Sequence, residues 1–197
     1  MNLKFILLLL ACTCVAFANG ASSRVAAQNS NYSDVEPKLV SLLSQIKHDE
    51  PAKANVNFKL GVRGDSDSPA TKNVYDLRYG GYANDKDLDW LEVPIAHGSS
   101  SQIKDLGELD WTEIYDTPFL YAGPVPHDGK RSEFYKNGKV IKSLPENTLV
   151  KAVVGHMYVV HTRGTDRDFY VMFRVVALKS GDEVTISWRI VPSPENN

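Results

Sequence analysis

Two neighbouring stretches near the C-terminus, DFYVMFRVVAL (residues 168–178) and EVTISWRIV (residues 183–191), carry the strongest structural signal in this chain. In both, apolar and polar side chains alternate, which is the period of a β-strand with one buried face. The residues that we expect in the core are Phe169, Val171, Phe173, Val175, Val184, Ile186, Trp188 and Ile190. The segment 179–182 between the stretches is short and polar. The two strands are therefore predicted to pair antiparallel, with their other face in water.

Further strands are predicted on the N-terminal side of this pair. Residues 156–163 and 148–154 are rich in β-branched and aromatic side chains, and Asn137-Gly138 between apolar residues is a strong hairpin signal. Residues 54–62 alternate again and predict another strand. Many short strands separated by turn residues indicate a mainly β protein, either an antiparallel β-sandwich or a small barrel.

One N-terminal amphipathic helix, over residues 33–48, is predicted to precede the strands. Ser33 and Glu36 have the spacing of a capping box. Apolar residues recur at helical spacing, at Val35, Leu39, Leu42, Leu43 and Ile46. We expect residues 33–197 to form a single β-rich domain that includes this helix, and residues 19–32, which are small and polar, to form a flexible leader.

The first 18 residues have the features of a signal peptide. Lys4 supplies a positive charge, an apolar stretch follows, and Ala16-Phe17-Ala18 has the pattern of a cleavage site. This pattern predicts a secreted or periplasmic protein whose mature form begins at Asn19. The alternative is a lipoprotein box, Leu9–Cys12, in which Cys12 would carry a lipid anchor to the cell envelope.

Composition narrows the classes of partner and of chemistry. The formal net charge is −2 and there is no run of basic residues, which disfavours nucleic acid as a partner. No segment is long and apolar enough to predict a membrane span. Both cysteines, Cys12 and Cys14, lie in the signal segment, so a chain that begins at Asn19 has no cysteine for catalysis or for a thiolate metal site.

The segment GHMYVVHTR (residues 155–163), followed by Phe173-Arg174-Val175 and Trp188, resembles a stretch of uncharacterised exported bacterial β-domain proteins. The shared pattern is G-H-x-Y-V-V-x-T-R, then F-R-V, and it covers the C-terminal quarter only. The resemblance implies a bacterial origin and a β meander. It implies no function, because none is attached to those proteins.

One acidic segment is a candidate metal site. Asp85, Asp87 and Asp89 alternate, and alternate carboxylates on a tight loop are able to converge on one calcium ion. The loop is not an EF-hand, since Trp90 and Ala96 occupy the positions of the required glycine and carboxylate. The favoured interpretation is a solvated acidic loop, and no cofactor is predicted. A calcium site remains the alternative. His156 and His161 are five positions apart on one strand, which predicts opposite faces and no shared metal.

Aromatic residues crowd the middle of the chain. Trp90, Trp111, Tyr82 and Tyr115 are the candidates for ligand binding, because exposed aromatic rings often hold sugars and protein partners. The alternative is that these rings fill the core between two sheets.

The chain has no nucleophile elbow, no zinc-protease motif and no phosphate-binding glycine loop. The leading hypothesis is therefore a non-catalytic extracytoplasmic β domain that binds a protein, a glycan or an envelope partner. A second hypothesis is a hydrolase of an envelope polymer that uses paired carboxylates such as Asp110 and Glu113. A third is a structural module of an exported assembly.

Overall fold

The structure is a computed structural model, and it describes residues 36–64, 75–82, 87–96, 98–113, 119–126, 129–141 and 145–194. The predicted signal segment with Cys12, the leader and Ser33 lie outside these ranges. The described part is mainly β, as predicted, with three antiparallel sheets.

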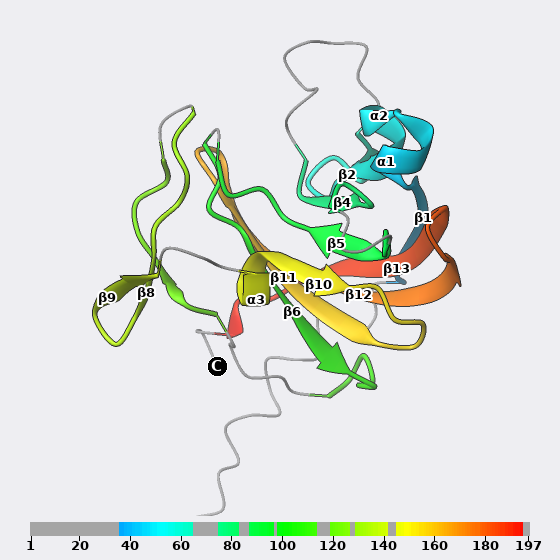
Figure 1. Cartoon of the computed structure of the whole chain (residues 1–197). Helices are drawn as coiled ribbons and strands as arrows, with labels where there is room; N and C mark the ends of the chain where they lie inside the picture. The colour runs from blue at the N-terminus through cyan, green and yellow to red at the C-terminus, as the bar shows by residue number, and fades with distance from the viewer. Residues whose placement is uncertain are drawn as a thin grey trace, which may run out of the picture.

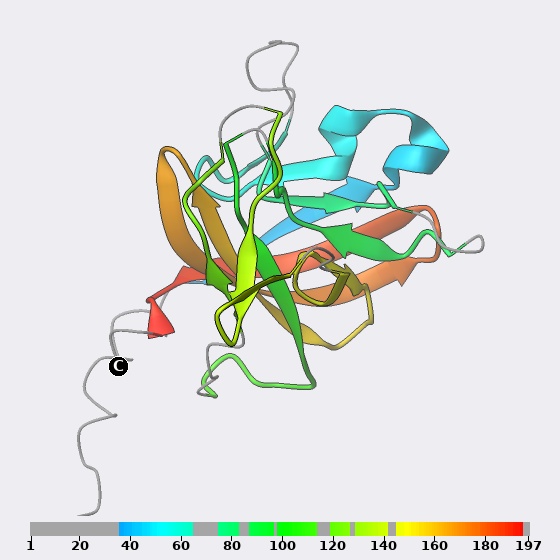
Figure 2. The ribbon, with the colours of Figure 1, turned by 60° about the vertical axis from the view of Figure 1, so that its left-hand side comes forward.

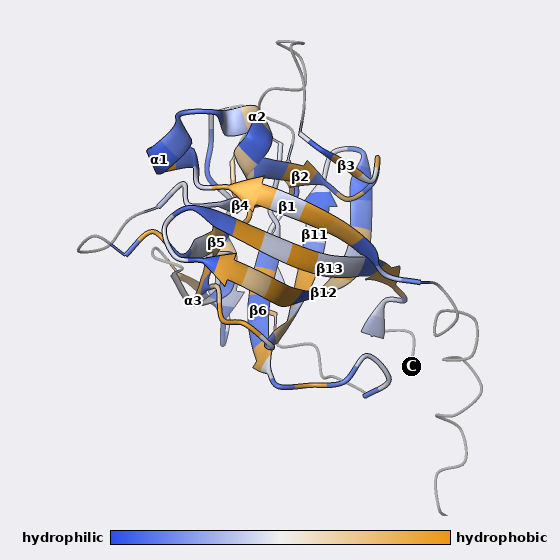
Figure 3. Ribbon diagram, turned by 90° about the vertical axis from the view of Figure 1, so that its right-hand side faces the viewer, coloured by the Kyte–Doolittle hydropathy of each residue, from blue (hydrophilic) through white to orange (hydrophobic). Residues whose placement is uncertain are grey.

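The larger strands form one five-stranded antiparallel sheet, here called sheet A. Its order is β1 (Lys38–Leu43), β13 (Glu183–Val191), β12 (Arg167–Lys179), β11 (Met157–Gly164) and β6 (Gln102–Gly107). The predicted pairing of the two C-terminal stretches is confirmed, with Phe173 opposite Trp188 and Val175 opposite Ile186. Figure 3 shows β1, β13 and β12 side by side, with hydrophobic and hydrophilic residues alternating along them.

A second five-stranded sheet, here called sheet B, consists of shorter strands. Its order is β10 (Leu149–Lys151), β5 (Trp90–Glu92), β4 (Leu77–Tyr79), β2 (Asn55–Asn57) and β3 (Val62–Arg63). Three single-turn helices, α1 (Gln45–His48), α2 (Pro51–Ala54) and α3 (Pro145–Thr148), connect strands.

The third sheet is small and consists of β7 (Tyr121–Ala122), β8 (Phe134–Lys136) and β9 (Lys139–Ile141). The predicted hairpin is confirmed, because Asn137 and Gly138 form the turn with φ angles of 52° and 74°. Figure 1 shows this hairpin projecting from the body of the molecule.

The main core lies between sheets A and B. Sheet A contributes side chains such as Phe173 and Ile186, and sheet B contributes Leu77, Tyr79 and Leu91, all fully buried. Figure 2 shows β4 and β5 layered over β12 and β13. Both sheets have free edges within the described part, so the architecture is an open sandwich and not the closed barrel that the sequence left as an alternative.

Most of the predicted core residues of the C-terminal strands are confirmed. Val171, Phe173, Val175, Val184, Ile186 and Trp188 are buried in the main core. Phe169 is only partly buried at its margin. Ile190 is 38% exposed, so its prediction was wrong. The strand period correctly gave the face of Ile190, but no core residue of sheet B covers that end of β13.

The prediction of an N-terminal amphipathic helix over residues 33–48 was wrong. Lys38–Leu43 form β1, which pairs with β13 along its whole length, and only the short α1 follows. Leu39 and Ile46, expected on the buried stripe, are 70% and 50% exposed. The physical reason is tertiary: β13 would otherwise present an unpaired edge, and pairing with it outweighs the helical pattern.

The strand predicted over residues 54–62 is also corrected. It is a tight hairpin in which β2 and β3 are joined by a turn through Gly61, whose φ is 71°. Val56 and Phe58 are in the core, whereas Leu60 and Val62 are 65% and 51% exposed.

Candidate functional site

The outer face of sheet A is not the wet face that the alternation predicted. Of its residues, Tyr170, Met172 and Arg189 are buried. Tyr170 and Met172 belong to a second apolar cluster with Met157, Val159 and Val191, against which Leu106, Leu109, Trp111 and Phe119 pack. A covering segment, residues 106–113, therefore lies on this face, and a neighbouring part of the chain returns to it at Phe119.

Two arginines of sheet A hold the covering segment. Arg174 donates from Nη2 to the carbonyl oxygen of Leu109 at 2.6 Å, and Arg189 donates from Nη2 to that of Trp111 at 2.7 Å. The guanidinium of Arg189 also lies over the indole ring of Trp111, 4.9 Å from its centre. Arg174 and Arg189 lie on the face that was predicted to be in water, and they instead bind the segment that covers it.

Beside this covered region, at the end of sheet A where β13 leads into Pro192 and Ser193, lies a pocket of about 400 Å³. Its lining consists of His161, Asp168, Phe169, Tyr170, Ile190, Val191, Pro192 and Ser193. The volume falls in the range of small-molecule sites. Ile190, which is 38% exposed, is one of these lining residues.

His161 and Asp168 provide the polar chemistry of the pocket. The Nε2 atom of His161 lies 2.7 Å from Oδ1 of Asp168. The imidazole ring stacks on the ring of Tyr170, with centres 4.3 Å apart and an interplanar angle of 7°. Because His161 and Tyr170 are cross-strand partners of β11 and β12, the backbone register itself creates this stack.

A histidine–aspartate pair alone does not distinguish this site. In the described part of the chain, His48 pairs with Asp182 and His156 pairs with Asp105 as well. Only the pair of His161 and Asp168 lines the pocket. The side chain of Asp168 is 69% exposed, whereas that of His161 is 15% exposed, so the carboxylate is the accessible partner.

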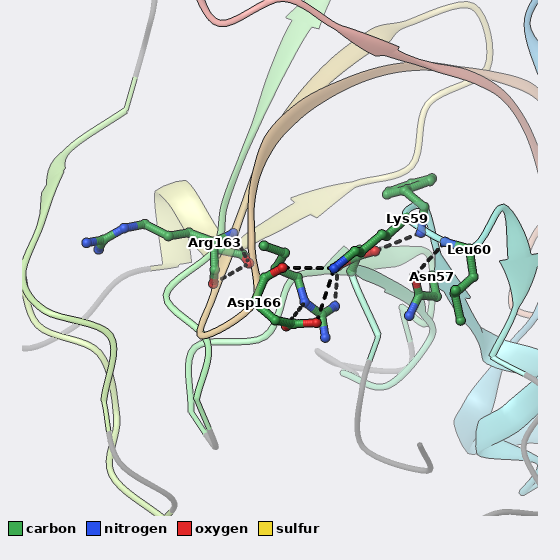
Figure 4. A network of polar contacts seen from close by, with 9 residues as sticks. Asn57, Lys59, Leu60, Arg163 and Asp166 are labelled. Atoms are coloured by element: carbon green, nitrogen blue, oxygen red, sulfur yellow. Dashed lines mark hydrogen bonds and ion pairs between the residues drawn. The ribbon is translucent and has the colours of Figure 1, made fainter. Parts of the chain in front are cut away.

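The hairpin that carries the pair is anchored at its tip. Lys59, in the β2–β3 turn, donates to the carbonyl oxygen of Asp166 at 2.9 Å (Figure 4). Figure 4 also shows the side chain of Arg163 extending to the opposite side of the hairpin. There, its Nη1 donates to the hydroxyl of Ser100 at 3.0 Å and to the carbonyl of Gly123 at 2.6 Å. The pocket is therefore built on a rigid support.

A buried ion pair adds the strongest anchor. Arg167 donates to Oδ1 of Asp76 at 2.6 Å, and the two side chains are 7% and 0% exposed. The other carboxylate oxygen accepts the N–H of Phe58 at 2.7 Å. Burial raises the pKa of Asp76, and the charge of Arg167 and the hydrogen bonds oppose that rise.

The predicted aromatic site is divided by the fold. Tyr82 and Trp90 meet edge to face, with ring centres 5.7 Å apart, beside sheet B. Trp111 packs on the outer face of sheet A instead. Tyr115 lies outside the described residues. The predicted ligand site therefore does not form from the three rings that the structure describes.

The predicted calcium ligands are engaged within the fold. Oδ1 of Asp89 accepts the hydroxyl of Tyr79 and the N–H of Gly181, at 2.6 and 2.7 Å, and its Oδ2 accepts the hydroxyl of Ser180 at 2.6 Å. Asp87 pairs with Lys151 at 2.5 Å. Asp85 lies outside the described residues, so the site stays a prediction. Among the residues that were searched, no group of three or more histidine, cysteine or acidic side chains converges.

Around Tyr75, burial dominates the electrostatics. Its ring lies 4.6 Å from the guanidinium carbon of Arg78, which also pairs with Glu92. Burial raises the pKa of the Tyr75 hydroxyl to about 12. This hydroxyl therefore stays protonated at neutral pH, which makes it a poor candidate for a general base.

The carboxylates of the hydrolase hypothesis lie in an exposed turn. Glu113 accepts the backbone N–H of Asp110 at 3.0 Å, and the Asp110 side chain is 76% exposed beside Arg174. Neither residue lines the pocket.

No family model, no curated protein and no solved structure matches this chain. None of the helices in the described ranges combines the length and the apolar character that a membrane crossing requires. The function is therefore inferred from the geometry of the side chains.

The pocket residues were missed by sequence reasoning. For His161 the sequence predicts only that it shares no metal with His156, and Asp168 is only the first residue of a predicted strand. One available signal was the position of the two residues on either side of one turn. The strand period places both on the same face of the sheet as Tyr170. The sequence offered no way to tell that Ile190 and Pro192 would close the pocket.

Proposed function

We propose that this protein is an extracytoplasmic β-sandwich that binds a partner, and that an exposed group of the partner enters the pocket beside His161 and Asp168. The observation that carries the proposal is the pocket itself. It combines a fixed ring stack, an accessible carboxylate and an apolar wall on an anchored hairpin. Concave sites that combine a few polar groups with apolar surface are typical of ligand binding.

The N-terminal sequence supports the extracytoplasmic part of the proposal. Residues 1–18 have the pattern of a secretion signal. The alternative, a lipid anchor at Cys12, would also place the domain outside the cytoplasm. The mildly acidic chain favours a partner other than nucleic acid.

Binding is favoured over hydrolysis because the paired carboxylates that suggested a hydrolase do not line this pocket. Asp110 and Glu113 are exposed and hydrogen-bond within their own turn or to Arg174. A hydrolytic site would be expected to place such groups in a concave surface, where water is excluded.

The experiment that tests the proposal is a fragment screen followed by amide NMR on the isotope-labelled protein. The probes are small sugars, amino acids, amines and carboxylic acids. We expect binding fragments to shift the resonances of the pocket lining. The Ile190→Trp variant, which narrows the pocket at a part-exposed position, should lose these shifts.

Val176→Trp is the matched control. Val176 is 42% exposed on β12 and does not line the pocket, so this variant should keep the wild-type response. Shifts that map elsewhere, or that persist in Ile190→Trp, would refute the proposed site.

A further inference from the structure

The pocket presents one rigid wall. The imidazole of His161 is fixed by its stack on Tyr170 and by its contact with Asp168. Phe119 contacts both rings, with centres 5.8 and 6.0 Å away. Leu120, next in the chain, is held by two hydrogen bonds with the side chain of Gln102, at 2.8 and 2.9 Å. A ligand would therefore meet rings that need no ordering, which reduces the entropy cost of binding.

The second feature is a carboxylate with acceptor capacity to spare. Oδ1 of Asp168 contacts His161, and within the described part of the chain Oδ2 has no hydrogen-bond partner. An ionised carboxylate has several lone pairs and no donor, so Asp168 selects ligands that donate.

The exposure of this carboxylate gives a cation little advantage as the donor. Asp168 is the one acidic residue among those that line the pocket, and its side chain is 69% exposed. An ion pair with so exposed a carboxylate contributes little to the free energy of binding. A neutral donor such as a hydroxyl group is therefore at little disadvantage.

Apart from Ser193, the remaining lining residues are apolar. Ile190 and Val191 come from the end of β13, Pro192 follows them, and Phe169 comes from β12. C–H groups pack favourably on such a surface, whereas a highly charged ligand would lose hydration there. The volume, at the lower end of the range for ligand sites, suits one ring better than a chain.

We infer that the pocket binds a neutral hydroxyl-bearing ring, of the chemical class of a monosaccharide unit, with Asp168 accepting hydrogen bonds from its hydroxyl groups and the apolar wall packing on its C–H face. This inference rests on the proposed function. Its partner is thus a glycan, through an exposed end or branch, rather than a protein.

The test is a set of amide NMR titrations of the full domain with methyl glycosides of common hexoses and N-acetylhexosamines, with tetramethylammonium and with acetate. We expect at least one glycoside to shift the pocket resonances, and the two ions to leave them unchanged. Asp168→Ala should weaken glycoside binding by about tenfold or more, because a charge-assisted hydrogen bond is lost.

Asp105→Ala is the matched control. It breaks the His156–Asp105 pair, outside the pocket, and should leave glycoside affinity unchanged. Asp168→Asn, which keeps a carbonyl acceptor, should bind more tightly than Asp168→Ala.

The outcomes separate this inference from the proposed function. If tetramethylammonium or acetate shifts the pocket and no glycoside does, the ligand class is wrong while the pocket still binds. If Asp168→Ala binds glycosides as wild type does, the role of Asp168 is refuted. If neither these probes nor the fragment screen shifts the pocket, the proposed function fails with the inference.

Discussion

Replacing Arg167 by methionine is expected to lower the free energy of unfolding by about 3–5 kcal/mol. The side chain is 7% exposed and its partner Asp76 is fully buried, with 2.6 Å between Nη1 and Oδ1. Methionine fills much of the same space but leaves the carboxylate without its counter-charge. The N–H of Phe58 still donates to Asp76, which keeps the cost from rising further.

The comparison with a nearby exposed pair sets the scale. Lys59 and Asp166 are 51% and 64% exposed, and their closest charged atoms are 3.4 Å apart. Lys59→Met should therefore cost less than about 1 kcal/mol. Each variant removes the cation of one ion pair between the β11–β12 hairpin and the rest of the protein. The difference between their unfolding free energies therefore measures the effect of burial.

Urea unfolding followed by tryptophan fluorescence is the assay, because Trp188 lies in the core and is 2% exposed. The midpoint should move strongly for Arg167→Met and little for Lys59→Met, with the same slope in urea for both. The double variant Asp76→Asn/Arg167→Met should be more stable than Arg167→Met alone, because the unpaired buried charge is gone.

The penalty also depends on pH. Burial already raises the pKa of Asp76 in the wild type, and in Arg167→Met it acts without the opposing charge, so the pKa rises further above that of the unfolded chain. The folded variant then holds a proton that the unfolded chain releases, and its stability falls as pH rises from about 4 through the raised pKa. The loss should thus be smaller near pH 4.5 (about the unfolded carboxyl range) than near neutral pH. A loss under about 1 kcal/mol at neutral pH, or one independent of pH, would refute this reasoning.

Phe173→Ala should cost about 3–5 kcal/mol in the same urea assay, because a fully buried ring is removed from between the sheets. Gly81→Ala should cost about 1–3 kcal/mol, because the new Cβ would clash with Oε1 of Glu92 and disturb the ion pair of Glu92 with Arg78; circular dichroism should show a lower melting temperature with the β signal retained. Asp89→Ala should also lower the melting temperature, since the hydroxyl of Tyr79 and two other donors lose their acceptor. Calcium should leave the wild-type melting temperature unchanged, because Asp89 already accepts those bonds; a rise reversed by a chelator would instead support the predicted calcium site.

The candidate site was less accessible to sequence reasoning than the core. Alternation correctly placed Tyr170 on the outer face of sheet A, but it assigned that face to water. The covering segment comes from residues 106–113, far from β12 and β13 in the chain, and alternation carries no information on such a partner. Trp111 is predicted to bind a ligand as one of the aromatic residues that crowd the middle of the chain, whereas in the structure its ring packs against Arg189.

Local sequence alone was sufficient for the C-terminal strands and for the turn at Asn137-Gly138. In these segments the period of the side chains and the preference of the backbone agree with the final contacts, and the strands pair with neighbours in the chain. Local sequence failed for Lys38–Leu43, where a helical pattern forms a strand because β13, distant in the chain, offers a free edge. The pocket depends on tertiary structure in the same way. His161, Asp168 and Ile190 come from three strands, and their convergence follows from register and layer packing, which act between segments and leave no periodic trace in any one of them.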